Sequence, residues 1–183
     1  MLEEVYANGL GCFPEMSRDR AWLLHELAHA RLAMGCNAEA EAEALFEQAL
    51  GIIKTALGEA HPDYAATLHE LARVRQVMGR SVEAEMIYEQ ALEINKAALG
   101  EAHLGTILTL ASLAGCRACI GHIDAARGMF ESAMARAEAL PEGATLWTGR
   151  VRLRWAHGLF GASLRKEAET DVTAGRNLPK SAV

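Results

Sequence analysis

The chain has 183 residues, of which 51% are hydrophobic and 23% charged, and its formal net charge is −6. This composition can bury a core, and its acidic balance disfavours nucleic acid as a partner because phosphate neutralisation needs a basic surface. The sequence contains no run of about 18 apolar residues, so no membrane span is predicted. Its first residues are acidic, which predicts no signal peptide. The four scattered cysteines predict reduced thiols and a cytoplasmic location.

Residues 1–17 are expected to form a short helix and a linker, with Pro14 interrupting the chain before the first repeat. From there on the sequence repeats itself. The segment LHELA at 24–28 recurs at 68–72 and returns as LASLA at 110–114. Such self-similarity at a fixed period is typical of repeat proteins, in which each unit packs on its neighbours.

A second segment follows the same period. FEQAL at 46–50 recurs as YEQAL at 88–92 and as FESAM at 130–134, and between them LGEAH at 57–61 recurs at 99–103. Apolar residues return at spacings of three and four in both halves of each unit, which predicts two helices per unit.

Glycines mark the ends of the expected helices. Gly35, Gly79 and Gly121 stand where each first helix must stop, and Pro62 suits the first turn of a helix. The expected divisions are repeats at 18–60, 61–102 and 103–142, a degenerate fourth repeat or C-terminal cap at 143–178, and a tail at 179–183.

The pattern of Leu71, Ala72, Gly79, Ala84 and Tyr88 resembles the tetratricopeptide signature, and the LGEAHPD linker resembles the kinesin-light-chain variety of that repeat. The resemblance implies an all-α fold, a right-handed superhelix of stacked antiparallel helix pairs (a TPR-like α-solenoid). It also implies a scaffold without catalysis or cofactor, which binds a protein or peptide on a concave surface lined by the first helices.

The register of the repeat gives candidate residues for that surface. They are Trp22, His25, His29, His69, Arg73, Gln76, Arg150, Arg154, His157 and Phe160, with Ala111, Gly115, Ala118 and Leu153 at equivalent positions. This wall is basic and rich in histidine within an acidic protein. It therefore predicts a partner with acidic side chains, held by charge-assisted hydrogen bonds, although solvated polar residues on an exposed face would give the same pattern.

Two other functions are compatible with the sequence. The last unit keeps Trp147, Trp155, Leu159 and Phe160, and an apolar patch there would indicate self-association or docking in a larger assembly. The segment His25-Glu26-x-x-His29 has the spacing of a zinc hydrolase, with Glu47 as a possible third ligand. Because the next unit reads HELAR at the same positions, the repeat explains the motif without a metal.

Three further features have structural interpretations. His-Pro-Asp at 61–63 resembles a cochaperone loop but lies in the repeat linker, and Cys116 and Cys119 lie within an expected helix, which favours packed thiols. Arg31, Arg75 and Arg117 recur in register and are expected to form ion pairs between units with Glu26 and Glu70.

Overall fold

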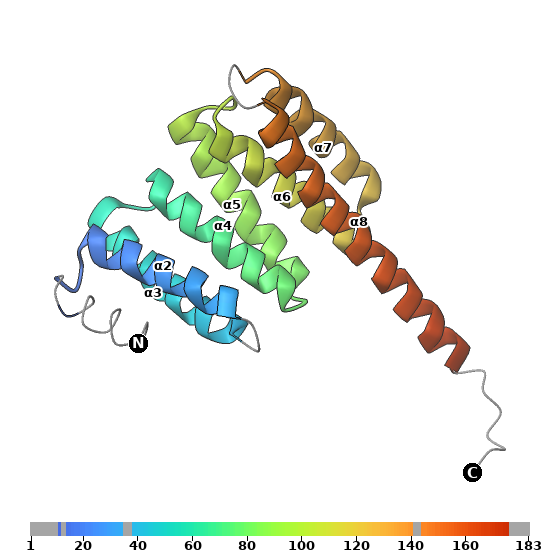
Figure 1. The fold of residues 1–183 in the computed structure, drawn as a ribbon, viewed down its shortest axis with the longest axis horizontal. Coiled ribbons are helices and arrows are strands. Elements are labelled where there is room, and N and C mark those ends of the chain that lie inside the picture. The colour runs from blue at the N-terminus through green and yellow to red at the C-terminus, as the bar shows by residue number, and fades with distance from the viewer. Residues whose placement is uncertain (1–10, 12–13, 35–37, 141–143, 176–183) are drawn as a thin grey trace, which may run out of the picture. The chain divides into compact units, whose positions relative to one another are not determined.

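The computed structural model describes residues 11, 14–34, 38–140 and 144–175, and within these ranges the regular structure is entirely helical (Figure 1). The helices are α2 (Arg18–Met34), α3 (Glu39–Leu57), α4 (Pro62–Val77), α5 (Ser81–Leu99), α6 (Leu104–Ile120), α7 (Ile123–Glu138) and α8 (Ala144–Gly175). The all-α prediction is confirmed, whereas the short helix expected near the N-terminus, Gly35 and the tail lie outside the described residues. None of the described helices combines the length and the apolar character that crossing a membrane requires.

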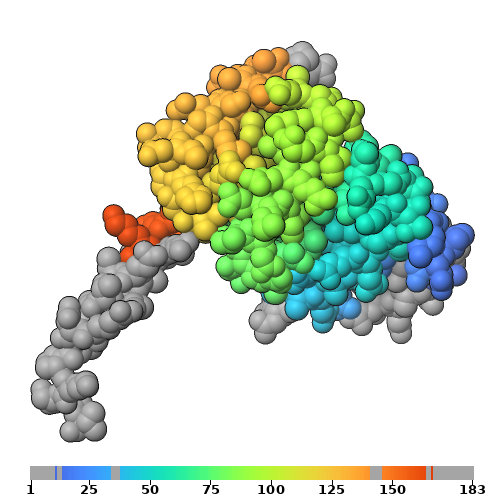
Figure 2. Space-filling view, turned by 180° about the vertical axis from the view of Figure 1, so that it is seen from behind, coloured from blue at the N-terminus to red at the C-terminus, as the bar shows by residue number. Residues whose placement is uncertain are grey.

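The chain divides into two compact units, Met1–Leu110 and Ala111–Val183. In the first unit α2 pairs with α3, α4 pairs with α5, and α3 packs against α4 (Figure 1). From behind, the parts of this unit drawn in cyan and green lie against one another as a continuous surface (Figure 2). The helix pairs predicted from the repeat are therefore present.

Small and aromatic residues fill the interior of the first unit in the way the repeat predicts. Ala72 and Ala84 are fully buried, which lets paired helices approach closely, and the Phe46 and Tyr88 rings are fully buried as well. Close packing of this kind makes any change of side-chain volume costly.

The described turns after α4 and α6 each contain a glycine in the left-handed region. Gly79 has φ of 80° and Gly121 has φ of 101°. The next residue closes the end of the helix, since the Arg80 amide donates to the Arg75 carbonyl and the His122 amide to the Arg117 carbonyl, each at 2.9 Å. The predicted C-terminal role of these two glycines is confirmed.

The linker histidines have a local structural role. The Nδ1 atom of His61 accepts a hydrogen bond from the Asp63 amide at 3.1 Å, and Pro62 occupies the first turn of α4. His103 accepts from the Gly105 amide at 3.0 Å in the same way. The His-Pro-Asp segment is thus a helix N-cap, in which an imidazole nitrogen takes the place that a hydroxyl or carboxylate oxygen usually fills.

Replacing His61 with alanine is expected to lower the free energy of unfolding by about 1 kcal/mol, because the first turn of α4 loses its side-chain cap. Replacing His61 with asparagine, whose side-chain oxygen can accept the same bond, should cost less. Urea unfolding followed by circular dichroism measures both. Equal losses in the two variants would show that capping is not what His61 contributes.

In the second unit α7 packs against α8, and α8 also crosses the end of α6 at two glycines. A Cβ atom added to Gly158 would collide with the backbone of Gly115, so the two helices touch there backbone to backbone. Nearby, the Phe130 and Trp155 rings stack with centroids 4.9 Å apart and an interplanar angle of 17°. Trp155, expected in an exposed patch, is therefore partly covered.

The last helix is continuous from Ala144 to Gly175, over the range where a degenerate repeat or a cap was predicted. Ser163 stands in register with Gly79 and Gly121. A residue with a Cβ atom enters the left-handed conformation at a cost, so the chain continues as a helix where the earlier units turn.

Candidate partner-binding surfaces

A cavity of about 420 Å³ opens between the first helices of the first two repeats, α2 and α4. It is lined by Arg18, Asp19, Ala21, Trp22, His25, Glu26, Ile53, Asp63, Ala66 and Thr67. Ala21 and Ile53 are buried and belong to the core behind it. The Trp22 side chain, in contrast, is 63% exposed at the cavity. The cavity brings together two predicted site residues, Trp22 and His25.

The charges around this cavity are mainly acidic. Arg18 Nε lies 2.8 Å from Asp63 Oδ2, so the arginine in the lining is already paired. Among the described residues, no cation lies within ion-pairing distance of Asp19 or Glu26. An entering group would therefore meet more negative than positive charge.

His25 and His29 lie next to the cavity on one face of α2. Their Nε2 atoms are 3.1 Å apart, and both rings meet the edge or face of the Phe46 ring at centroid distances of 5.2 and 5.5 Å. Burial lowers the pKa of His25 below its ordinary value, and the proximity of His29 lowers it further. The neutral form of His25 is consequently favoured.

The lowered pKa of His25 makes the free energy of unfolding depend on pH. Because the folded-state pKa of His25 is lowered, the unfolded chain takes up a proton before the folded chain does as the pH falls. Stability contributed by neutral His25 is complete above the unfolded value of about 6.5 and is lost as the pH falls below it. Urea unfolding at pH 7.5 and 5.5 should show a smaller loss in the His25→Gln variant than in the wild type. An equal loss in both would contradict this assignment.

His69 was predicted to line the groove, and this prediction is wrong. Its side chain is 7% exposed, and Nδ1 lies 3.1 Å from the Thr109 hydroxyl oxygen, which also accepts from Asn95 Nδ2 at 3.2 Å. The ring meets Tyr88 edge-on. His69 is therefore part of a polar network in the core, because α5 and α6 supply partners that cover it.

Arg73 and Gln76 also have partners within the first unit. Arg73 Nε donates to Glu70 Oε2 at 2.8 Å, and Gln76 Oε1 lies 3.5 Å from the Tyr88 hydroxyl. Burial favours the protonated form of Glu70, but His69 and the Arg73 guanidinium outweigh it, so the pKa of this carboxyl is lowered. The positive charge of Arg73 is largely offset, and the basic wall predicted here is close to neutral.

In the second unit the equivalent positions of α6 are covered. Ala111, Gly115 and Ala118, predicted to face the groove, are buried, and the Gly115 backbone contacts Gly158 of α8. Cys116 is buried and Cys119 is half-buried, and neither is part of a disulfide. This part of α6 therefore offers no open surface for a partner.

The remaining predicted residues lie on α8. Arg150 lies over the Trp147 ring, 5.4 Å from its centroid, while Arg154 is half-buried with a partner of its own. His157 and Phe160 are exposed, the latter at 65%. Five of the exposed residues of α8 form a row at spacings of three and four along the helix: Leu146, Arg150, Leu153, His157 and Phe160. We call this row the α8 face.

The structure places no third metal ligand beside the His25-Glu26-x-x-His29 motif among the described residues. Glu47, the third ligand considered, lies 2.8 Å from Arg75 Nη2 and so belongs to an ion-pair cluster. Within the described residues, no group of three or more His, Cys, Asp or Glu side chains is placed to hold a metal ion. The cluster also corrects the expected pairing of Arg75, whose partners are Glu43 and Glu47 rather than Glu70.

Sequence reasoning missed most of the cavity lining, including the charged residues Arg18, Asp19 and Asp63. A signal for them was present. Asp19 and Asp63 stand 44 positions apart, the same step that separates His25 from His69. Asp19, Trp22 and Glu26 also follow one another at spacings of three and four, which places them on one face of α2.

The comparison with known proteins places the fold and the repeat in one family. The model of the tetratricopeptide repeat matches residues 19–94 and 65–139, so the chain belongs to the tetratricopeptide repeat family. Its repeats are of the kinesin-light-chain type. A Podosopora anserina structure described as a kinesin light chain with nearly identical TPR-like repeats is 28% identical, with a TM-score of 0.68, covering 96% of this chain and 82% of that chain.

A point-mutant form of that protein is 26% identical over the same shares of each chain, with a TM-score of 0.69. The crystal structure of BtubC (BKLC) from P. vanneervenii is 21% identical, with a TM-score of 0.70, covering 99% of this chain and 77% of that chain; it shows the shared fold. The search of curated proteins gave no match.

Proposed function

We propose that this chain is a scaffold that binds an extended peptide, or a segment of a partner protein, on the surface that α2 and α4 form in the first unit. The cavity between these helices supports the proposal, because an exposed tryptophan beside a concave site is a common anchor for a protein partner. The site contains Trp22 and His25 of the predicted residues, with His29 next to them on α2. We propose no catalytic role for it.

Selection of displayed random peptides against the whole chain tests this proposal. Ala66 lines the cavity and is exposed, so Ala66→Arg places a long side chain at the cavity without removing a core contact. Ala97, an exposed alanine of α5 outside the cavity lining, gives the matched variant Ala97→Arg. We expect selected peptides to bind the Ala97→Arg variant normally and the Ala66→Arg variant at least about tenfold more weakly. Equal binding to both variants would place the binding surface elsewhere.

A second candidate function concerns the α8 face. Leu146, Leu153 and Phe160 are exposed apolar residues on one side of this helix, and α8 carries arginines but no acidic residue before Glu167. A basic and apolar helix face is complementary to an acidic amphipathic helix. We propose that the predicted acidic partner binds here rather than at the first unit.

The alternative occupant of the α8 face is a second copy of this chain. Sedimentation across a range of protein concentrations separates the two cases. A monomer that binds an acidic amphipathic peptide, and loses this binding in a Phe160→Glu variant, supports the acidic partner. A dimer that dissociates in the same variant would instead show that α8 mediates self-association.

A further inference from the structure

The cavity between α2 and α4 has a distinct chemical character, which is set by an aromatic ring and carboxylates. The Trp22 indole is mostly exposed and lies in the same lining as Asp19 and Glu26. On α2 these three residues are separated by three and four positions, so their side chains leave one face of the helix together. An indole ring beside carboxylates is the combination that binds a cation, since the face of the ring is negative and the carboxylates supply full charge.

The positive charge of the lining is largely offset. Arg18 is held by Asp63 through the 2.8 Å contact of Nε with Oδ2. Burial and His29 lower the pKa of His25, which favours its neutral form. A carboxylate entering the cavity would meet a lining in which Asp19, Glu26 and Asp63 outnumber Arg18, and this net negative charge would weaken its binding.

We propose that this cavity binds a basic side chain of the partner, an arginine or a lysine, whose cation lies against the Trp22 ring and pairs with Glu26 and Asp19. This inference rests on the proposed function, because it names the residue type that the peptide-binding surface selects. It reverses, for the first unit, the acidic preference predicted from the sequence. The reversal follows because Arg73 and Arg18 are paired, whereas the two carboxylates of α2 have no cationic partner among the residues that the structure describes.

The shape of the site favours arginine over lysine. The rim of the cavity offers an aromatic face and carboxylates together, and a planar guanidinium can stack on a ring while it donates to a carboxylate. An ammonium group can do only one of these well at a time. The buried Ala21 and Ile53 side chains behind the rim would contact the methylene groups of the arginine stem.

A set of three five-residue peptides tests the proposal. Each is acetylated, amidated and built of alanine around one central residue, which is arginine, citrulline or glutamate. Citrulline has nearly the shape of arginine without its charge. Binding to the full chain is followed by the shift of the Trp22 indole N–H signal in nitrogen-15 spectra, which the Trp22→Phe variant assigns among the three tryptophans.

We expect the arginine peptide to bind roughly tenfold more tightly than the citrulline peptide, and the glutamate peptide to bind most weakly. Glu26→Gln should reduce this preference about threefold to tenfold, whereas Glu131→Gln, at an exposed carboxylate of α7 outside the lining, should leave it unchanged. Equal binding of the arginine and citrulline peptides, or tighter binding of the glutamate peptide, would overturn the proposal.

The test is separable from that of the proposed function. Some selected peptides could lose binding to the Ala66→Arg variant and yet contain no basic residue. Such peptides would support the proposed binding surface and refute the preference for a basic side chain. Selected peptides that bind the Ala66→Arg variant as tightly as the wild type would refute the proposed binding surface itself. A preference for arginine or lysine at one position of the selected peptides, lost in Glu26→Gln, would support both.

Discussion

Replacing Gly158 with alanine is expected to destabilise the chain by about 3 kcal/mol, because the added methyl group has no room at the crossing of α6 and α8. The atoms that it would meet are the carbonyl oxygen, the Cα atom and the carbonyl carbon of Gly115. A backbone cannot move aside as a side chain can. The helices must separate, and contacts such as the Phe130–Trp155 stack must loosen with them. Gly115→Ala should act similarly, since its Cβ would lie 2.7 Å from the Arg154 carbonyl oxygen.

Gly149→Ala is the matched control, because it makes the same chemical change in the same helix. A Cβ atom at Gly149 meets nothing within 4 Å, and the position is exposed. Glycine inside a helix costs roughly 0.5–1 kcal/mol relative to alanine, so this variant should be more stable than the wild type. The two substitutions are thus expected to change the free energy of unfolding in opposite directions.

Urea unfolding followed by tryptophan fluorescence measures the difference. In a Trp22→Phe background the two remaining tryptophans, Trp147 and Trp155, are both in α8, so the signal reports on the second unit. If Gly158→Ala proved as stable as Gly149→Ala, α6 and α8 would not touch backbone to backbone.

The parts of the fold that repeat could be predicted from the sequence, because a repeat compares the chain with itself. Gly79 and Gly121 each end a first helix with positive φ, as their shared register predicts. Pro62 lies in the first turn of α4 for the same reason. Local backbone preferences at these positions are strong enough to decide the structure without knowledge of the tertiary contacts.

The side-chain partners could not be predicted in the same way. The register places His69 and His25 at equivalent positions, yet His69 is buried against Thr109 while His25 lies beside a cavity. The threonine itself recurs, since Thr67 is equivalent to Thr109, but Asn95, which donates to Thr109, is replaced by Ile53 in the first repeat. A repeat register gives the side of a helix on which a residue lies, and the side chains of the helices packed against it determine what covers it.

The charge of the candidate site was also difficult to predict from the sequence. Arg73 was predicted to attract an acidic partner, and Glu70, three positions earlier on the same helix face, neutralises it. That pairing could have been inferred from spacing alone. The pairing of Arg18 with Asp63 could not, because it joins two repeats across 45 positions. Net charge along a groove can therefore be predicted only after pairs between units are known.

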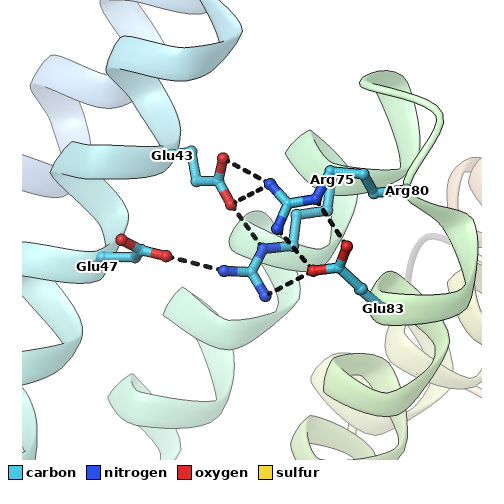
Figure 3. Close-up of polar contacts among 5 residues, drawn as sticks. All are labelled: Glu43, Glu47, Arg75, Arg80 and Glu83. Carbon is cyan, nitrogen blue, oxygen red and sulfur yellow. Dashed lines mark hydrogen bonds and ion pairs between the residues drawn. The ribbon is translucent and has the colours of Figure 1, made fainter.

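Replacing Arg75 with methionine is expected to cost about 2–3 kcal/mol, less than a fully buried ion pair and more than an exposed one. Arg75 of α4 lies between acids of two other helices (Figure 3). Its Nε is 2.7 Å from Glu43 Oε1, and its Nη2 is 2.8 Å from Glu47 Oε1, both on α3. Nη1 lies 3.7 Å from Glu83 Oε2 on α5. The side chains of Arg75 and Glu43 are 18% and 15% exposed, so water screens this pair weakly.

The charge of the cluster explains why the loss is large. Two arginines and three carboxylates meet here, because Arg80 donates to both oxygens of Glu43 at 2.8 and 2.9 Å and also pairs with Glu83. Without Arg75 a single guanidinium would face three carboxylates, of which Glu43 is poorly hydrated. The carboxylates of Glu43 and Glu47 on α3 would then repel one another and Glu83 on α5.

An exposed pair provides the control. Arg18 and Asp63 also join two repeats at 2.8 Å, but their side chains are 65% and 36% exposed. Arg18→Met should therefore cost less than about 1 kcal/mol. Double-mutant cycles measure the coupling directly, with Glu43→Gln paired to Arg75→Met and Asp63→Asn paired to Arg18→Met.

Arg75→Lys separates charge from geometry within the cluster. A lysine keeps the positive charge, but its single ammonium group cannot donate at once to Glu43 on one side and Glu47 on the other in the fixed fork of a guanidinium. We expect Arg75→Lys to lose about half of the stability that Arg75→Met loses, roughly 1–1.5 kcal/mol. Full retention of stability in the lysine variant would mean that net charge alone holds α3 and α4 together here, and that the bridging geometry of Arg75 contributes nothing measurable.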